Sequence, residues 1–398
     1  MRSWLTYIFL LMVACGTVLT SCSDVLSEES LGTCDDRTTV RLTISFGGED
    51  GPMSRDVGSN PAPKDDDLDY TTEAQAKIVD GDIFALVVNE DNTLVEYIDD
   101  LHIVGAVAQD QNNYYTWTLE GTMRPTTGNN KVKIVLLANL KENGITNPHD
   151  YFVNLEEGKD LTTDVYTSLI YSYNGSTWSL SNNRIPMWGE TAATTVPASS
   201  NPELACYLYR AMAKVQIWVN MKNGIAGTTD PNSTNDDFTI TKITVMNANN
   251  QGYCVHVAEN QPTTNTQYSQ PKVPTSVEVQ GDIVYNVNDE DSNDDTFNDA
   301  RQAFSDMIYL PEQINFDDDG NKLSNAVTIE VTYNYNGETG KVGTIHFTED
   351  IIRNHSYIFN INVSNDAEPA MYYEVINWTS VNNGTLTFGG SGGAVLTQ

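Results

Sequence analysis

The chain has 398 residues, and 54 Asp and Glu against 21 Lys and Arg give it a formal net charge of −33 at pH 7. This charge argues against nucleic acid and anionic membrane faces as partners, because phosphate contacts need clusters of Lys and Arg, which the sequence lacks. The length is sufficient for two domains with cores of their own. Plentiful Thr, Asn, Tyr, Val and Gly, together with the absence of long helical periodicity, indicate an all-β chain.

The first residues are typical of a secretory signal that ends at a lipid-bearing cysteine. The apolar run from Leu5 to Val18 is too short to span a bilayer and follows the basic Arg2. Next comes Leu19-Thr20-Ser21-Cys22, which resembles a bacterial lipobox. We therefore expect residues 1–21 to be a signal peptide, and Cys22 to carry acyl chains that anchor the chain in the outer membrane.

Alternatives to this lipid anchor are a plain signal peptide with a chance cysteine, and acylation at Cys15, which would leave a very short apolar run. The segment behind Cys22 is acidic, with Asp24, Glu28 and Glu29. Acidic residues just after the cysteine resemble a surface-export signal of lipoproteins in the Bacteroides group. A plain solvated linker is the alternative interpretation of the same residues.

A strand is predicted over Thr39 to Phe46, where apolar residues alternate with polar or charged ones. Its apolar face consists of Val40, Leu42, Ile44 and Phe46. The following residues, Gly47 to Asp69, are rich in Gly, Pro, Ser and Asp and predict a long exposed loop. Arg55 lies in this loop, and exposed loops are where proteases cut most readily.

Further strands are predicted at short intervals, a density typical of β-sandwiches. They cover residues 83–88, 132–137, 209–219, 239–246, 277–285, 307–310, 327–333, 343–347, 357–363, 372–378 and 385–388. Residues 155–171 predict a short helical or irregular excursion. The stretch IPMWGE, Ile185 to Glu190, predicts a compact turn with an exposed Trp-Gly.

A Pro- and Ser-rich stretch, Val196 to Pro202, marks the predicted domain boundary. We expect residues 22–55 to be an acidic tether and first strand. Residues 56–203 would then form an N-terminal β-sandwich of transthyretin-like type, and residues 204–398 a C-terminal one with a tail.

Signals for catalysis are absent from the sequence. It contains no GxSxG, HExxH, CxxC, P-loop or dinucleotide fingerprint, so we expect neither an enzyme nor a cofactor. Asp289, Asp291 and Asn293 have the spacing of a calcium loop, but Gly at position six and Glu at position twelve are missing, so a solvated loop is the preferred interpretation. Cys206 and Cys254 could form a disulfide or remain buried free thiols.

Taken together, several motifs resemble those of the fimbrillins, the subunits of type V pili in Bacteroides-group bacteria. They are the lipobox at Cys22, TVRLTISF followed by the loop with Arg55, KVKIVLLANL, IPMWGE, YRAMAKVQIWV, MIYLPEQ, IIRNHSYIFNINV and the closing YYEVINWTS. The resemblance covers most of the mature chain and rests on the order and spacing of these pieces.

The resemblance implies a fimbrium at the cell surface that grows by strand exchange. An Arg-specific surface protease would cut at Arg55, with Arg37 and Arg41 as alternative sites, and the strand with Val40, Leu42, Ile44 and Phe46 would leave. A donor strand from another pilin subunit, in a homo- or heteropolymer, would then fill its place by β-augmentation. In this chain the donor would lie within residues 372–398, with Leu386, Phe388, Val395 and Leu396 as its apolar residues.

Three alternative functions remain open from the sequence. Six Trp and 20 Tyr could line a glycan-binding groove of a surface lipoprotein that does not polymerise, and an uncleaved chain could anchor a pilus. A secreted hydrolase is the weakest interpretation, since paired carboxylates in so acidic a chain carry no information. As a pilus subunit, the chain could also present an adhesive surface to a host or bacterial ligand.

Overall fold

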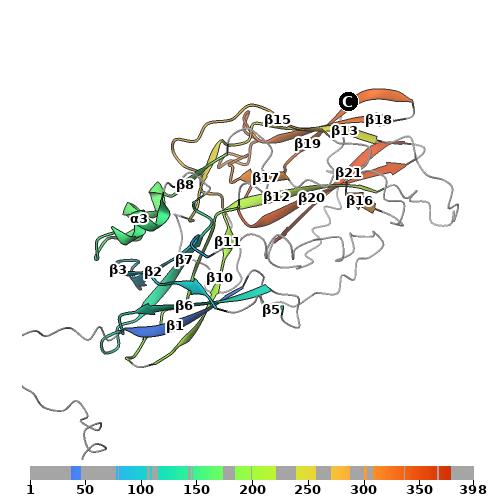
Figure 1. Cartoon of the computed structure of the whole chain (residues 1–398). Coiled ribbons are helices and arrows are strands. Elements are labelled where there is room, and N and C mark those ends of the chain that lie inside the picture. Colours follow the sequence, from blue (N-terminus) through green and yellow to red (C-terminus); the bar gives the residue numbers. More distant parts are fainter. Residues whose placement is uncertain are drawn as a thin grey trace, which may run out of the picture. The chain divides into compact units, whose positions relative to one another are not determined.

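The structure is a computed structural model. It describes residues 37–45, 78, 80–104, 108–109, 115–141, 145, 147–173, 184–198, 200–220, 239–256, 270–286, 300–302, 308–335, 337–364 and 367–377. These residues are nearly all in β-strands and the loops between them, which confirms the all-β prediction (Figure 1).

Two sheets enclose an N-terminal core. The first has the strand order β10-β1-β6-β4, with β5 also paired to β6, and the second has the order β11-β9-β7-β2-β3. The strands of the first sheet are β1 (Thr38–Ser45), β4 (His102–Ile103), β5 (Ala108–Gln109), β6 (Tyr115–Met123) and β10 (Glu203–Tyr207). Those of the second are β2 (Ile83–Asn89), β3 (Leu94–Ile98), β7 (Val132–Ala138), β9 (Met187–Glu190) and β11 (Tyr209–Arg210).

The second sheet is buried on both faces, whereas β1 of the first sheet is buried on one. Alternate residues of β2 pack into two different cores, with Ala85 and Val87 facing the first sheet and Phe84 and Leu86 facing away from it. Short helices supply part of the outer cover: α3 (Pro148–Val153), α4 (Leu161–Asp164) and η2 (Tyr166–Ser168). Continuous apolar runs such as IFALVV are typical of strands covered on both faces.

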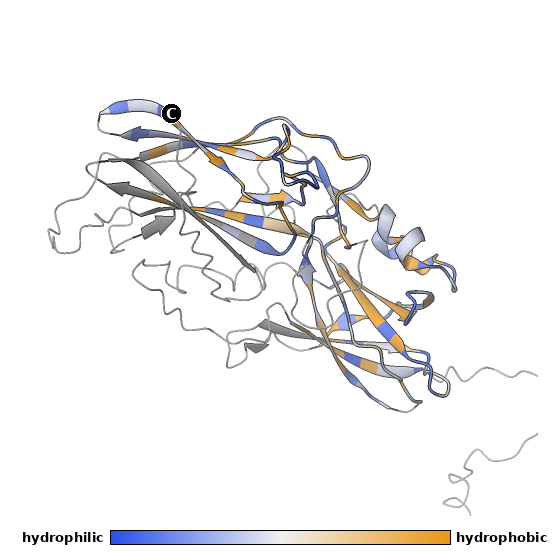
Figure 2. Cartoon of the chain, turned by 180° about the vertical axis from the view of Figure 1, so that it is seen from behind, coloured by the Kyte–Doolittle hydropathy of each residue, from blue (hydrophilic) through white to orange (hydrophobic). Residues whose placement is uncertain are grey.

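The C-terminal half contains two further sheets around a second core. One has the order β16-β12-β20-β21, with β17 also paired to β12, and the other has the order β15-β13-β18-β19. The strands of the first are β12 (Met212–Asn220), β16 (Ala300–Gln302), β17 (Ile308–Pro311), β20 (His355–Ser364) and β21 (Ala367–Asn377). Those of the second are β13 (Thr239–Met246), β15 (Ile283–Asn286), β18 (Thr328–Tyr335) and β19 (Glu338–His346). Figure 2 shows hydrophobic and hydrophilic residues alternating along several strands, the pattern of half-buried sheets.

Direct contacts join the two halves. Strand β8 (Ile170–Ser172) pairs with β14 (Gln251–Tyr253), and the Tyr171 hydroxyl donates to the Ala211 carbonyl at 3.1 Å.

A buried ion pair lies within the C-terminal half. The guanidinium of Arg353 binds the carboxylate of Glu312 at 2.7 Å, and both side chains are 1% exposed. Arg353 also donates to the carbonyl of Tyr253 at 3.0 Å, so this buried charge pair is hydrogen-bonded on several sides.

Most of the predicted strands are confirmed, among them β1, β2, β7, β13 and β18. The helical or irregular excursion predicted at residues 155–171 is confirmed in α4 and η2, although its last two residues belong to strand β8. Strand β10 spans the predicted domain boundary at residue 203 and β11 lies behind it, and both pair within the N-terminal sheets. Among the helices of the described residues, none has the length and apolar character that a membrane crossing requires.

The turn predicted at IPMWGE is wrong. Residues Met187–Glu190 form β9, between β7 and β11, and Trp188 is 2% exposed with its ring against Tyr166 at a centroid distance of 6.1 Å. A side chain at Gly189 would meet the carbonyl of Tyr207 and would lie 2.9 Å from Cys206 Sγ. Glycine is therefore needed here for the close approach of β10, and it does not mark a turn.

Candidate functional site

The candidate site is strand β1 and its two neighbours. β1 lies inside its sheet, antiparallel to β6 on one side and parallel to β10 on the other (Figure 1). Leu42 has Leu119 of β6 and Leu204 of β10 as register partners, and Ile44 has Trp117 and Cys206. Backbone hydrogen bonds therefore hold β1 along both edges.

The apolar face of β1 points into the N-terminal core. Val40, Leu42 and Ile44 are each 0% exposed and pack in one cluster with residues of both sheets. Burial of a side chain of this size contributes about 1.5–3 kcal/mol relative to leaving it exposed. Loss of β1 would therefore open an apolar slot between β6 and β10.

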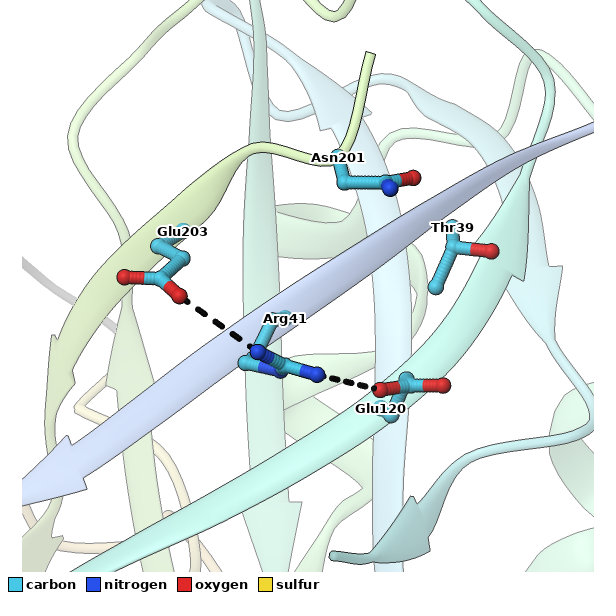
Figure 3. Close-up of a pocket in the computed structure, with 5 residues that line it drawn as sticks. All are labelled: Thr39, Arg41, Glu120, Asn201 and Glu203. Carbon is cyan, nitrogen blue, oxygen red and sulfur yellow. Dashed lines mark hydrogen bonds and ion pairs between the residues drawn. The ribbon is translucent and has the colours of Figure 1, made fainter. Parts of the chain in front are cut away.

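The solvent face of β1 carries an arginine between two glutamates. Arg41 Nη2 lies 3.1 Å from Glu120 Oε2 on β6, and Arg41 Nη1 lies 3.5 Å from Glu203 Oε1 on β10 (Figure 3). Thr39 and Asn201 complete the lining of this hollow, whose volume is about 230 Å³. The hydrogen bond and charge of Glu120, and to a smaller extent those of Glu203, raise the pKa of Arg41.

A second arginine fixes the start of the strand. Arg37 Nη2 donates to the carbonyl of Thr122 at 2.9 Å and lies 3.2 Å from Glu96 Oε2 on β3. Glu96 also binds Arg124, whose Nε lies 3.4 Å from the same oxygen. The Glu96 carboxylate thus links Arg37, which precedes β1, to Arg124, which directly follows β6.

Chain connectivity makes β1 separable by one cut. It is the first strand in the described part of the chain, so a single break between Ser45 and Ile83 would detach it from β2 and all later strands. Arg55 is the only arginine in that interval of the sequence. A cut at Arg37 or Arg41 would leave all or part of β1 attached to β2, and the Arg41 amide is bonded to the Pro202 carbonyl at 3.0 Å.

The structure brings three of the predicted site residues together, namely Val40, Leu42 and Ile44. The others lie outside the described residues: Cys22, Phe46, Arg55, Leu386, Phe388, Val395 and Leu396. Of the predicted donor range, residues 372–377 belong to β21, where they pair with β20.

Sequence reasoning missed both neighbours of β1. The stretch YTWTLEGTM of β6 carries a usable signal, because Trp117, Leu119 and Met123 alternate with Thr and Glu. Gly121 keeps this period although it has no side chain, and a Cβ there would lie 2.7 Å from Ile98 Cγ2. The short ELACY of β10 offers no comparable pattern.

Among the described residues, no group of three or more His, Cys, Asp and Glu is placed to hold a metal ion. The acidic turn at Asp317 is satisfied internally, since its carboxylate accepts the backbone N–H of Asn321 at 2.7 Å and of Asp319 at 3.0 Å. Asp289, Asp291 and Asn293 lie outside the described residues. Cys206 and Cys254 are free, buried thiols that belong to different core clusters.

Several solved structures resemble this fold. A fimbrial assembly protein from Parabacteroides distasonis matches at 15% identity with a TM-score of 0.48, covering 85% of this chain and 98% of that one. The tip fimbrial protein Mfa3 from Porphyromonas gingivalis, with a C-terminal truncation, matches at 15% identity and 0.47, covering 85% and 100%. The fimbrial anchor protein Mfa2 of the same organism matches at 9% and 0.33, covering 86% and 98%.

No protein-family model matches the sequence, and neither does any curated protein.

Proposed function

We propose that this chain is a structural subunit of a cell-surface fimbria, and that β1 is a temporary strand whose place is taken by a strand from another subunit. The observation that carries the proposal is the position of β1. It is internal in its sheet, yet among the described strands it is joined to the others by one connection only. The order and spacing of the motifs that resemble fimbrillins support the same function.

In this mechanism β1 protects the chain during export. An unpaired slot exposes backbone groups and apolar surface, and such edges aggregate. With β1 in place, Val40, Leu42 and Ile44 fill the core and both neighbouring strands are paired. The chain would travel as a lipoprotein acylated at Cys22 and lose β1 at the outer membrane, where an Arg-specific protease cuts after Arg55.

The slot then receives an incoming strand. Backbone hydrogen bonds to β6 and β10 supply affinity, and alternate apolar side chains entering the positions of Val40, Leu42 and Ile44 supply fit. The chain acts through assembly rather than catalysis, and a subunit of this kind can present an adhesive surface. The donor segment of this chain would lie behind β21, in residues 378–398, with Leu386, Phe388, Val395 and Leu396 as its apolar residues.

The test is the composition of the assembled protein on cells. Fimbriae sheared from the surface should contain this chain beginning at Asp56, without β1. The Arg55→Gln variant should keep Cys22 and its lipid and should be absent from the sheared fraction. A surface form that retains residues 22–45 as a monomer would contradict the proposal. Retention of those residues at the base of a fimbria would favour the anchor alternative, and retention together with glycan binding would favour the glycan-binding lipoprotein.

A further inference from the structure

The solvent face of the β1 slot has a defined charge pattern. Glu120 and Glu203 are the register partners of Arg41 on the two neighbouring strands. The Arg41 guanidinium reaches them through different nitrogens, at 3.1 and 3.5 Å (Figure 3). A planar guanidinium can bridge two carboxylates in this way, whereas an ammonium is a single compact charge.

Departure of β1 removes the cation and leaves both carboxylates. Neighbouring strands lie about 4.8 Å apart, so Glu120 and Glu203 would face each other across about 10 Å of open slot. Glu96, at the start of β1, differs because Arg124 stays beside it at 3.4 Å. The middle of the empty slot, between Glu120 and Glu203, is therefore the point where negative charge is not neutralised, and the chain as a whole is already strongly acidic.

Residues 378–398, the proposed donor segment of this chain, cannot neutralise this point. Residues 356–398 contain no Lys, Arg or His, and residues 378–398 have no charged side chain at all. A tail from a second copy would bring Thr, Asn, Gly, Ser or an apolar residue to the register of Arg41. Two opposed carboxylates would then remain without a cation.

We propose that the strand that replaces β1 comes from a different protein and carries arginine at the register of Arg41. This inference rests on the proposed function and names its partner: the slot accepts an unlike subunit rather than a second copy of this chain. Exposed ion pairs are individually weak, so the arginine provides selectivity while the apolar face provides most of the affinity. A preference of about three- to tenfold follows from two exposed pairs.

The experiment uses the full mature chain with a specific protease site inserted between Ser45 and Ile83. After cutting, fluorescent peptides compete for the slot. They are the sequence of residues 37–45, its Arg41→Lys and Arg41→Gln forms, and the tail sequence of residues 378–398. Affinity is compared at low salt and at about 1 M salt, where the screening length falls to about 3 Å.

We expect the arginine peptide to bind about three- to tenfold more tightly than the Gln peptide at low salt, with Lys between them. The preference should shrink at high salt. It should also disappear in the double variant Glu120→Gln and Glu203→Gln. The matched control changes two exposed glutamates of the C-terminal half, Glu278→Gln and Glu338→Gln, and should keep the preference.

Equal affinity of the Arg and Gln peptides would overturn this inference and leave strand exchange intact. Binding of the tail peptide as tight as that of the arginine peptide would overturn it in the same way, as would polymers formed by the cut chain alone. If no peptide enters the slot, the strand is not exchangeable, and the proposed function fails together with the inference.

Discussion

The two terminal strands of the described chain, β1 and β21, differ in how the protein holds them. Each lies at one end of the described sequence, so one break would separate either from its neighbours. Within the described residues, β21 pairs only with β20 and forms the edge of its sheet, whereas β1 pairs with both β6 and β10. Loss of β21 would leave a sheet one strand smaller, while loss of β1 would leave a gap inside a sheet. Only the second change creates a slot of defined shape for another strand.

Deletion of each strand should give the largest difference. A chain that begins at Asp56 lacks β1 and should aggregate during refolding, because the slot exposes apolar surface and two strand edges. A chain that ends at residue 366 lacks β21 and should remain soluble with a moderate loss of stability. Light scattering and the yield of soluble protein measure both effects. A peptide of residues 37–45 added in trans should restore solubility of the variant that lacks β1. If that variant is soluble without the peptide, the expected difference between loss of β1 and loss of β21 is contradicted.

Within β1, the apolar face should matter far more than the polar face. Leu42→Ala removes a side chain that is 0% exposed and should lower the free energy of unfolding by about 2–5 kcal/mol. The matched control Thr43→Ala, on the opposite face, should change it by about 0.5 kcal/mol or less. Urea unfolding measures both. Similar costs at the two positions would mean that β1 is not anchored through its core face.

Acid should weaken the half that contains β21 through His256. Burial and, to a smaller extent, the charge of Arg353 lower the pKa of His256 to about 4. In the unfolded chain this imidazole binds a proton near pH 6.5, whereas in the folded chain it stays neutral until about pH 4. The free energy of unfolding is therefore unaffected by His256 above pH 6.5 and decreases as the pH falls from 6.5 toward 4. The free energy of unfolding should decrease by about 3 kcal/mol at most through this group.

His256→Gln is the matched variant for this pH dependence. It should flatten the slope of the unfolding free energy between pH 6.5 and 4, measured by urea unfolding at each pH. An unchanged slope would assign the acid sensitivity to other groups.

The smallest expected effect concerns the charges on the outer face of β1. In the intact chain, Arg41→Gln should lower the free energy of unfolding only slightly, because both ion pairs are exposed. The loss should be smaller still in about 1 M salt, where such pairs are screened. A loss as large as that expected for Leu42→Ala would mean that Arg41 also holds the strand in a way that its two ion pairs do not explain.

The sequence predicted strands best where alternation or a continuous apolar run was clear. TVRLTISF of β1 alternates because one face of β1 is buried. IFALVV of β2 is continuously apolar because both faces of β2 are buried. Trp188 was misassigned because its neighbour Gly189 looked like a turn residue. The reason for that glycine, contact with Cys206 and Tyr207, is a tertiary feature that no local pattern contains.

The charged part of the site was beyond local sequence reasoning for a similar cause. Glu120 and Glu203 lie 83 positions apart in the sequence and meet only because β1 pairs with both of their strands. In a chain with 54 acidic residues, neither stands out by composition. Pairing of strands distant in sequence therefore determined the site, and only the β1 pattern could be read in advance.

The most direct measurement of strand release is thiol accessibility. Cys206 faces the core beside Ile44 of β1, and Cys254 belongs to the other core cluster, so the chain carries a reporter and an internal control. Burial raises the pKa of both thiols, that of Cys254 to about 12, which keeps them protonated and unreactive at pH 8.

After a complete cut at Arg55 and removal of the released segment, we predict that an alkylating reagent labels Cys206 while Cys254 stays protected, as read by mass spectrometry. A peptide of residues 37–45 should restore protection of Cys206. If Cys206 remains as protected as Cys254 after the cut segment has gone, β1 does not cover an exchangeable slot, and the central claim is contradicted.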